Sequence, residues 1–206
     1  MTTERRPGPG HGHLLQTSSL VALAMLAASA IALFLAPLLM PSSYSWVVNT
    51  TSESAAQGVE GAWLARIGLA LFGLAVLAIW RVVADRWGRG GRIALASFGV
   101  LMLVTAVFSV RPWGDGAVYN EFEDLIHSLA ATVMGFAFAL GVFAVAVKRS
   151  AVTMPRRALD ALAVLSSIAI PLSMMQWPGQ AGLLQRLMFG IAYGWFAMEA
   201  VRPRDA

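Results

Sequence analysis

Long uncharged apolar stretches alternate with short polar segments along this chain. Six stretches have the length of membrane helices: residues 20–40, 62–83, 93–110, 125–147, 158–175 and 183–201. A membrane-spanning helix needs about 20 mostly apolar residues. Arg186 and Glu199 lie near the ends of the last stretch, where long side chains can reach the headgroup level. The pattern predicts an all-α fold, a polytopic bundle of six transmembrane helices.

The first apolar stretch also has the features of a signal peptide, because Arg5 and Arg6 precede it. Its Pro-Leu-Leu-Met-Pro ending lacks a small-residue cleavage motif, which favours a membrane helix. We expect residues 1–19 to form a disordered cytoplasmic tail and residues 202–206 to form a second, shorter one.

The positive charges alternate between the two ends of the predicted helices. Of the 15 Lys and Arg residues, all but Arg66, Arg111 and Arg186 fall before the first stretch, after the last, or in and directly beside the second and fourth connections. Basic residues of membrane proteins concentrate on the cytoplasmic side. Both termini are therefore predicted to be cytoplasmic.

The composition supports a membrane location and limits the chemistry. Apolar residues make up 58% of the chain, charged residues 13%, and cysteine is absent, whereas soluble domains are about 45–50% apolar and about 25% charged. Six spans leave no room for a soluble catalytic domain. No cofactor, metal or nucleic-acid partner is expected, and the enzyme motifs GxSxG, HExxH and CxxC are absent.

Acidic residues lead into the fourth stretch. Asn120 and Glu123 have the spacing of a helix capping box, which is an ordinary structural role. Asp124 and His127 share a helix face, so a carboxylate and an imidazole could instead hold a metal or relay a proton. Because a catalytic zinc needs three protein ligands, Glu53 would have to complete that site.

Arg66 and Arg186 each lie about one turn inside the N-terminal end of a predicted helix. A cation is unfavourable there because the helix dipole is positive at that end. The compensating partner is either an outer-loop carboxylate or an anionic ligand such as a lipid phosphate.

Glycine patterns mark one turn and one packing surface. Residues 88–92, Gly-Arg-Gly-Gly-Arg, predict a tight cytoplasmic turn. Gly190 and Gly194 form a GxxxG motif, which is typical of helix–helix packing in membranes and could bind a partner helix.

Three features resemble the membrane protein family called domain of unknown function 998. They are Ser52-Glu53 in a Tyr-containing first outer loop, His127 at the start of the fourth stretch, and Gly182-Leu-Leu-Gln-Arg186 at the start of the sixth. The resemblance covers residues 18–201. It implies a multi-pass protein of the prokaryotic plasma membrane, with six spans and no established activity. Members commonly carry Glu where this chain has Gln185, which weakens the case for a catalytic acid at this position.

Three functions remain open. A non-enzymatic protein would bind a lipid headgroup or small anion in a polar pocket on its outer face. An intramembrane enzyme would act on lipid or cell-envelope substrates through Glu53, Asp124 and His127. A structural or assembly subunit would pack against partners, and membrane lipids are expected partners in every case. The candidate outer-face site consists of Ser52, Glu53, Arg66, Asp124, His127 and Arg186.

Overall fold

The computed structural model describes residues 9–114, 116–149 and 153–202. Its long helices are α1 (Pro9–Leu35), α2 (Ala62–Val107), α3 (Glu121–Lys148), α4 (Met154–Gln176) and α5 (Ala181–Val201). Short 3₁₀ helices lie at Ala36–Leu39, Glu53–Ala55 and Pro178–Gln180. The described residues contain no strand, so the all-helical prediction is confirmed.

Helix α2 is a hairpin rather than a rod. Its 46 residues would extend for about 69 Å if straight, about twice the hydrocarbon thickness of a bilayer. Gly88 alone leaves the helical conformation, with φ 69° and ψ 172°. A Cβ built on Gly73 would lie 2.7 Å from the carbonyl oxygen of Gly99, so the two arms pack closely together.

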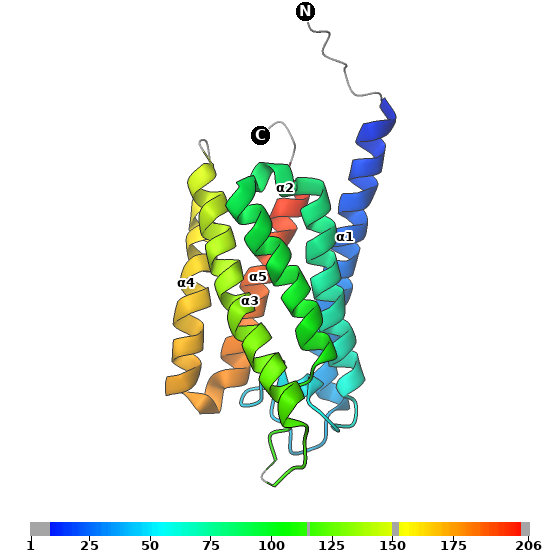
Figure 1. Ribbon diagram of the computed structural model, residues 1–206, viewed down its shortest axis with the longest axis vertical. Coiled ribbons are helices and arrows are strands. Elements are labelled where there is room, and N and C mark those ends of the chain that lie inside the picture. The colour runs from blue at the N-terminus through cyan, green and yellow to red at the C-terminus, as the bar shows by residue number, and fades with distance from the viewer. Residues whose placement is uncertain (1–8, 115, 150–152, 203–206) are drawn as a thin grey trace, which may run out of the picture.

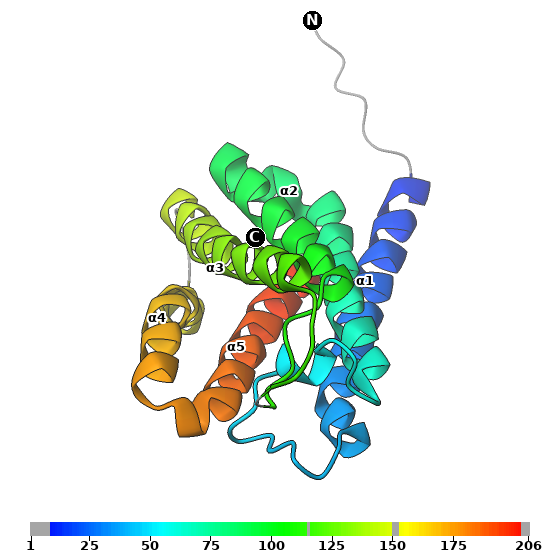
Figure 2. The ribbon, with the colours of Figure 1, turned by 60° about the horizontal axis from the view of Figure 1, so that its bottom comes forward.

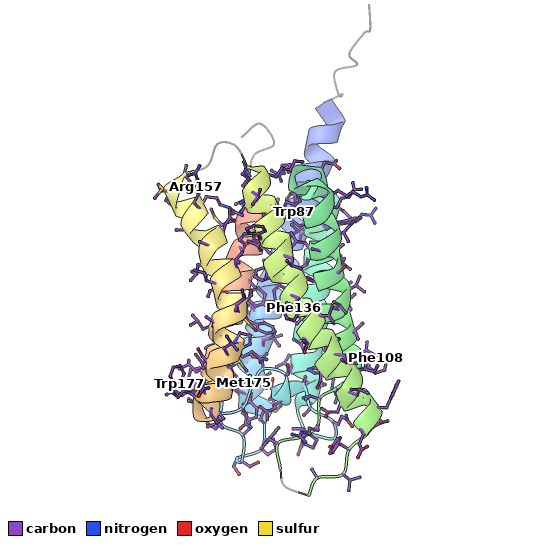
Figure 3. All side chains as sticks on the ribbon, turned by 60° about the vertical axis from the view of Figure 1, so that its left-hand side comes forward. Trp87, Phe108, Phe136, Arg157, Met175 and Trp177 are labelled. Atoms are coloured by element: carbon purple, nitrogen blue, oxygen red, sulfur yellow. The ribbon has the colours of Figure 1, made fainter. Side chains whose placement is uncertain are left out.

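The bundle has two distinct ends. The segments 40–61, 108–114, 116–120 and 177–180 gather at one end, which we call the loop end (Figure 1); Figure 2 turns this end toward the viewer. The Gly88 turn, the C-terminus of α3 and the C-terminus of α5 lie at the other, the basic end (Figure 1). In Figure 3, Trp87 and Arg157 mark the basic end, and Phe108 and Trp177 mark the loop end.

The centre of the bundle is aromatic. Phe72 stacks on Tyr193 with ring centroids 4.2 Å apart, and Phe98 and Phe138 each contact Phe196 with tilted rings. These rings come from α2, α3 and α5. Burial of such large apolar side chains fixes how the α2 hairpin, α3 and α5 pack together.

The outside of the bundle is also apolar. Phe34, Val107, Phe136 and Leu165 are all more than half exposed, and similar residues cover every long helix (Figure 3). A water-soluble monomer rarely exposes so large an apolar surface. Four helical segments, including the whole of α2 and Thr17–Leu39, are long and apolar enough to cross a membrane. The chain is therefore a helical membrane protein.

Helix bounds differ from the predicted ones mainly at two places. Helix α1 begins at Pro9, so residues 9–19, which we expected to be disordered, are helical, and residues 1–8 lie outside the described chain. Proline suits the first turn of a helix, and no helix breaker follows Gly12. The polar segment 84–92 does not form a separate loop, because a single glycine reverses the chain.

Candidate functional site

The start of α5 is enclosed by residues 40–61, which connect α1 to α2 and which we call the first loop. The backbone N–H groups of Gly182 and Leu183 donate to the carbonyl oxygens of Val48 and Val47, each at 3.1 Å. A Cβ on Gly182 would lie 2.2 Å from the carbonyl oxygen of Asn49, so only glycine permits this approach. The loop thus satisfies N–H groups that a helix start leaves unpaired.

Arg186 is bound by the same loop. Its Nη1 donates to the carbonyl oxygens of Trp46 at 2.6 Å, Asn49 at 2.9 Å and Gly182 at 3.0 Å. Its Nη2 donates to the hydroxyl of Tyr44 at 2.7 Å, and its guanidinium lies 5.7 Å from the centroid of the Trp46 ring. All these partners are uncharged.

The Tyr44 hydroxyl stays a neutral partner of Arg186. Burial raises the pKa of Tyr44, and the nearby Arg186 charge only partly offsets that effect. The phenol therefore keeps its proton at neutral pH and donates to the carbonyl oxygen of Thr50 at 3.0 Å.

Gln185, Ser52 and Glu53 also hold the loop in place. The Gln185 Oε1 accepts from the backbone N–H groups of Thr51 at 2.7 Å and Ser52 at 3.3 Å. The Glu53 carboxylate accepts from the backbone N–H and the hydroxyl of Thr50 at 2.6 and 2.9 Å. A Glu at position 185 could accept the same two bonds, so this position has a structural use.

Arg66 repeats the pattern of Arg186. Its Nε and Nη2 donate to the carbonyl oxygens of Ala55 and Ala56 at 3.0 and 2.9 Å. We expected either a carboxylate or an anionic ligand as the partner of each arginine, and in both cases the structure places backbone carbonyls around the guanidinium.

Asp124 and His127 have separate partners. The Asp124 Oδ1 accepts from the backbone N–H of Arg111 at 2.8 Å, and the His127 Nδ1 is 2.8 Å from the carbonyl oxygen of Phe108. Among the described residues, no three His, Asp or Glu side chains lie close enough to hold a metal ion. Glu53, Asp124 and His127 thus share no hydrogen bond in this part of the chain.

Asn120 caps α3, as its position predicted. Its Oδ1 accepts from the N–H groups of Phe122 and Glu123 at 3.0 and 3.3 Å. In a capping box the Glu123 side chain would accept from the backbone N–H of Asn120. Here that N–H donates to Gln57 Oε1 at 2.7 Å instead. This contact ties the first loop to the start of α3.

Two cavities open at the loop end. The first, of about 580 Å³, is lined mainly by loop residues and includes Glu53, Arg111 and Tyr119. The hydrogen bond with Tyr119, followed by the charges of Asp124 and Glu53, raises the pKa of Arg111. The acidic and basic groups of this pocket therefore already compensate one another.

The second cavity is an apolar groove between α1 and α5, with a volume of about 720 Å³. We call it the α1–α5 groove. Its lining is Ala30, Leu33, Phe34, Pro37, Leu38, Trp46, Thr51, Leu183, Arg186, Leu187, Phe189, Gly190 and Tyr193. Arg186 is the only charged side chain in that lining. Of the predicted site residues, only Arg186 lines this groove.

A buried charge cluster at the basic end was not predicted. It consists of Arg149, Arg156, Asp160 and Glu199, whose side chains are each at most 8% exposed; we call it the four-charge cluster. Arg149 Nη1 contacts both Asp160 carboxylate oxygens at 2.9 and 2.6 Å, while its Nη2 donates to Glu199. Arg156 donates to Glu199 at 2.5 Å.

Two tryptophans complete the four-charge cluster. The Trp195 indole donates to Asp160 at 2.7 Å, and the Trp87 indole donates to Glu199. The cluster has two positive and two negative groups, so it is neutral as a whole. Sequence reasoning assigned its arginines to cytoplasmic loops; the one available signal was the four-residue spacing of Arg156 and Asp160 within a helix.

Comparison with known proteins identifies the family. No curated protein and no solved structure matches the chain. The family model described as "Protein of unknown function (DUF998)" matches residues 21–202, which include all five long helices in whole or in part. The chain belongs to this family.

Proposed function

We propose that the chain is a multi-pass protein of the prokaryotic plasma membrane, with six spans and both termini in the cytoplasm. The two arms of α2 supply two spans, and α1, α3, α4 and α5 supply the others. The concentration of Lys and Arg at the basic end supports a cytoplasmic location for that end. The loop end is then the outer face.

At that outer face, we propose that the protein binds an anionic amphiphile, such as a phospholipid, in the α1–α5 groove and performs no chemistry on it. One observation carries the proposal: a long apolar groove ends at an arginine whose hydrogen-bond partners are all neutral. Carbonyl and phenol oxygens satisfy the donors of Arg186, but they leave its net charge uncompensated. A charge beside apolar surface favours an anion nearby.

The geometry supports a particular orientation of the amphiphile. Its chains would lie against Phe34, Leu38, Leu187 and Gly190, and its headgroup would lie near Arg186 and Thr51. Arg186 lies five residues into α5, or about 7.5 Å along the helix, which is headgroup depth. Phe34, Leu38 and Leu187 in its lining are more than half exposed, so a lipid of the surrounding bilayer would have access to the groove.

The enzyme alternative has less support. Glu53, Asp124 and His127 each contact a different backbone or hydroxyl group, and none of them lines the α1–α5 groove.

The test compares two arginines with the same structural role. Both Arg66→Gln and Arg186→Gln remove hydrogen bonds to loop carbonyls, but only Arg186 lines the groove. In detergent, phosphatidylglycerol should raise the melting temperature of the wild type and Arg66→Gln more than phosphatidylcholine with the same chains does, because a ligand that prefers the folded state stabilises it. Arg186→Gln should lose that difference.

Two further measurements locate the effect. Gly190→Leu should reduce the gain from phosphatidylglycerol by narrowing the groove without changing its charge. Inorganic phosphate should give little stabilisation without the chains. An equal preference for phosphatidylglycerol in wild type and Arg186→Gln would contradict the proposal.

A further inference from the structure

A second groove lies at the basic end, between α3 and α4. Its volume is about 500 Å³, and we call it the α3–α4 groove. Most of its lining is apolar, and its charged lining residues are Arg149, Arg157 and Asp160. The apolar lining consists of Phe143, Ala146, Val147, Ala161, Val164 and Leu165.

The charges in this lining do not cancel. Asp160 is engaged by Arg149 and by the Trp195 indole, and the four-charge cluster to which it belongs is neutral. Arg157 is exposed, and no described carboxylate forms an ion pair with it. The groove therefore carries one positive charge in excess.

Two further features concern the arginines beside the groove. The Nε of Arg149 is buried without a hydrogen-bond partner among the described residues, and the Arg149 side chain is only 5% exposed. Helix α4 has no acidic residue in its first turn; that turn contains Arg156 and Arg157. Glu199 and Asp160 compensate Arg156, so Arg157 is left as the cation at the positive end of this helix dipole, where a nearby anion would be favourable.

We propose that the α3–α4 groove binds the phosphate of an anionic phospholipid from the leaflet at the basic end. Arg157 supplies the main contact, and the Arg149 guanidinium forms the inner wall. This site is independent of the α1–α5 groove, because the two share no lining residue.

The apolar lining favours a lipid over free phosphate. Phe143 precedes Arg149 by six residues, and Leu165 follows Arg157 by eight. Helical rise places them about 9–12 Å from the charges, on the side toward the middle of the bundle. A phosphate at Arg157 would thus be followed by a surface suited to an acyl chain.

Native mass spectrometry of the full chain, released from detergent, tests this site. Phosphatidylglycerol is added to the wild type, Arg157→Gln, Ala161→Phe and the control Arg89→Gln. Arg89 is also exposed at the basic end but does not line the groove. Arg157→Gln should weaken phosphatidylglycerol binding at one site about tenfold, as the loss of a charged hydrogen bond predicts.

The other variants separate the explanations. Ala161→Phe should weaken the same binding by filling the groove, whereas Arg89→Gln should leave it unchanged. If Arg157→Gln and Arg89→Gln lose phosphatidylglycerol binding equally, the lipid is held by diffuse attraction to the surface and the proposed site is wrong. Undiminished phosphatidylglycerol binding by Ala161→Phe would also overturn the site. If millimolar inorganic phosphate displaces bound phosphatidylglycerol as effectively as added phosphatidylglycerol does, then the site binds a free anion, and the lipid proposal is contradicted.

The two proposed sites can fail separately. Arg186→Gln should remove one bound phosphatidylglycerol and Arg157→Gln another, so the double variant should retain neither. If Arg186→Gln has no effect while Arg157→Gln does, the α3–α4 site stands and the proposed function falls. The reverse result overturns only the α3–α4 site.

Discussion

The Nε1 of Trp195 donates a 2.7 Å hydrogen bond to Oδ1 of Asp160, 35 residues earlier in the chain. This bond joins the C-terminal half of α5 to the N-terminal half of α4. The same tryptophan ring lies 5.4 Å from the guanidinium carbon of Arg156, so one side chain both orients the carboxylate and covers an arginine of the four-charge cluster.

Removal of one charge from this cluster should be costly. Asp160→Ala leaves Arg149 buried with only Glu199 as an ionic partner. We expect the free energy of unfolding to fall by about 3–5 kcal/mol, as for other broken buried ion pairs, measured by denaturant unfolding in detergent. The control is Asp85→Ala, which breaks an exposed 3.7 Å ion pair with Arg92. This substitution should change the free energy of unfolding by less than about 1 kcal/mol. Similar losses would show that the cluster contributes no more than a surface pair.

Gly88 and Gly90 provide a matched pair at the α2 turn. Gly88 has φ 69° and ψ 172°, a region open essentially only to glycine, and a Cβ there would lie 2.8 Å from Cδ of Lys148. Gly88→Ala should therefore destabilise the protein by about 1–3 kcal/mol. At Gly90 the nearest atom to a Cβ is 3.6 Å away, so Gly90→Ala should be neutral or slightly stabilising. A harmless Gly88→Ala would mean that the turn tolerates another conformation.

Gly182 can test whether the first loop depends on α5. A Cβ at this position would meet backbone carbonyl oxygens of Asn49 and Trp46 at 2.2 and 2.5 Å. Gly182→Ala should displace the loop and increase its cleavage by protease, whereas Gly179→Ala, with no atom within 4 Å of its Cβ, should not. Unchanged cleavage of Gly182→Ala would contradict tight docking of the loop.

Reporter fusions can test the orientation. Truncation fusions of alkaline phosphatase after residue 57 or 120 should be active, because the proposed orientation places these loops outside. Fluorescent-protein fusions after residue 90 or 202 should be bright, because those positions are proposed to be cytoplasmic. A phosphatase-active fusion after residue 202 would overturn the six-span topology.

The GxxxG surface remains a candidate contact for a partner helix. A Cβ on Gly190 or Gly194 would meet no described atom within 4 Å, so neither glycine is needed for packing inside the bundle. If a second copy or another helix packs here, Gly194→Leu should reduce cross-linked oligomers while leaving lipid binding unchanged, since Gly194 does not line the α1–α5 groove. Unaltered cross-linking would remove this surface from consideration.

The helical stretches could be predicted because their signal is local. Predominantly apolar stretches located the helices, and Asn120 was identified as a cap from its position before the acidic turn. The extent of α2 could not be predicted, since the polar segment 84–92 is typical of a loop. The reversal depends on a single residue, Gly88, whose φ of 69° and ψ of 172° are open essentially only to glycine.

The site was harder to predict because its contacts are between distant segments. The position of Arg186 near a helix start correctly indicated a need for compensation, but side-chain chemistry alone suggested an acid or an anion. Its actual partners are carbonyl oxygens from residues about 140 positions earlier, such as Trp46, which carry no sequence signal. The ion pairs of Arg149 and Arg156 could not be predicted for another reason. In the sequence, a basic residue beside a membrane helix is the same whether its side chain contacts water or a buried carboxylate.

The dependence of the four-charge cluster on Glu199 has a consequence for biosynthesis. Arg149, Arg156 and Asp160 emerge from the ribosome before α5, so at that stage two cations share one carboxylate. A chain without α5 would hold an unbalanced charge at this end of the bundle. Glu199 and the Trp195 indole arrive together with α5, so the cluster becomes electrically balanced only when the last helix has been synthesised and packed.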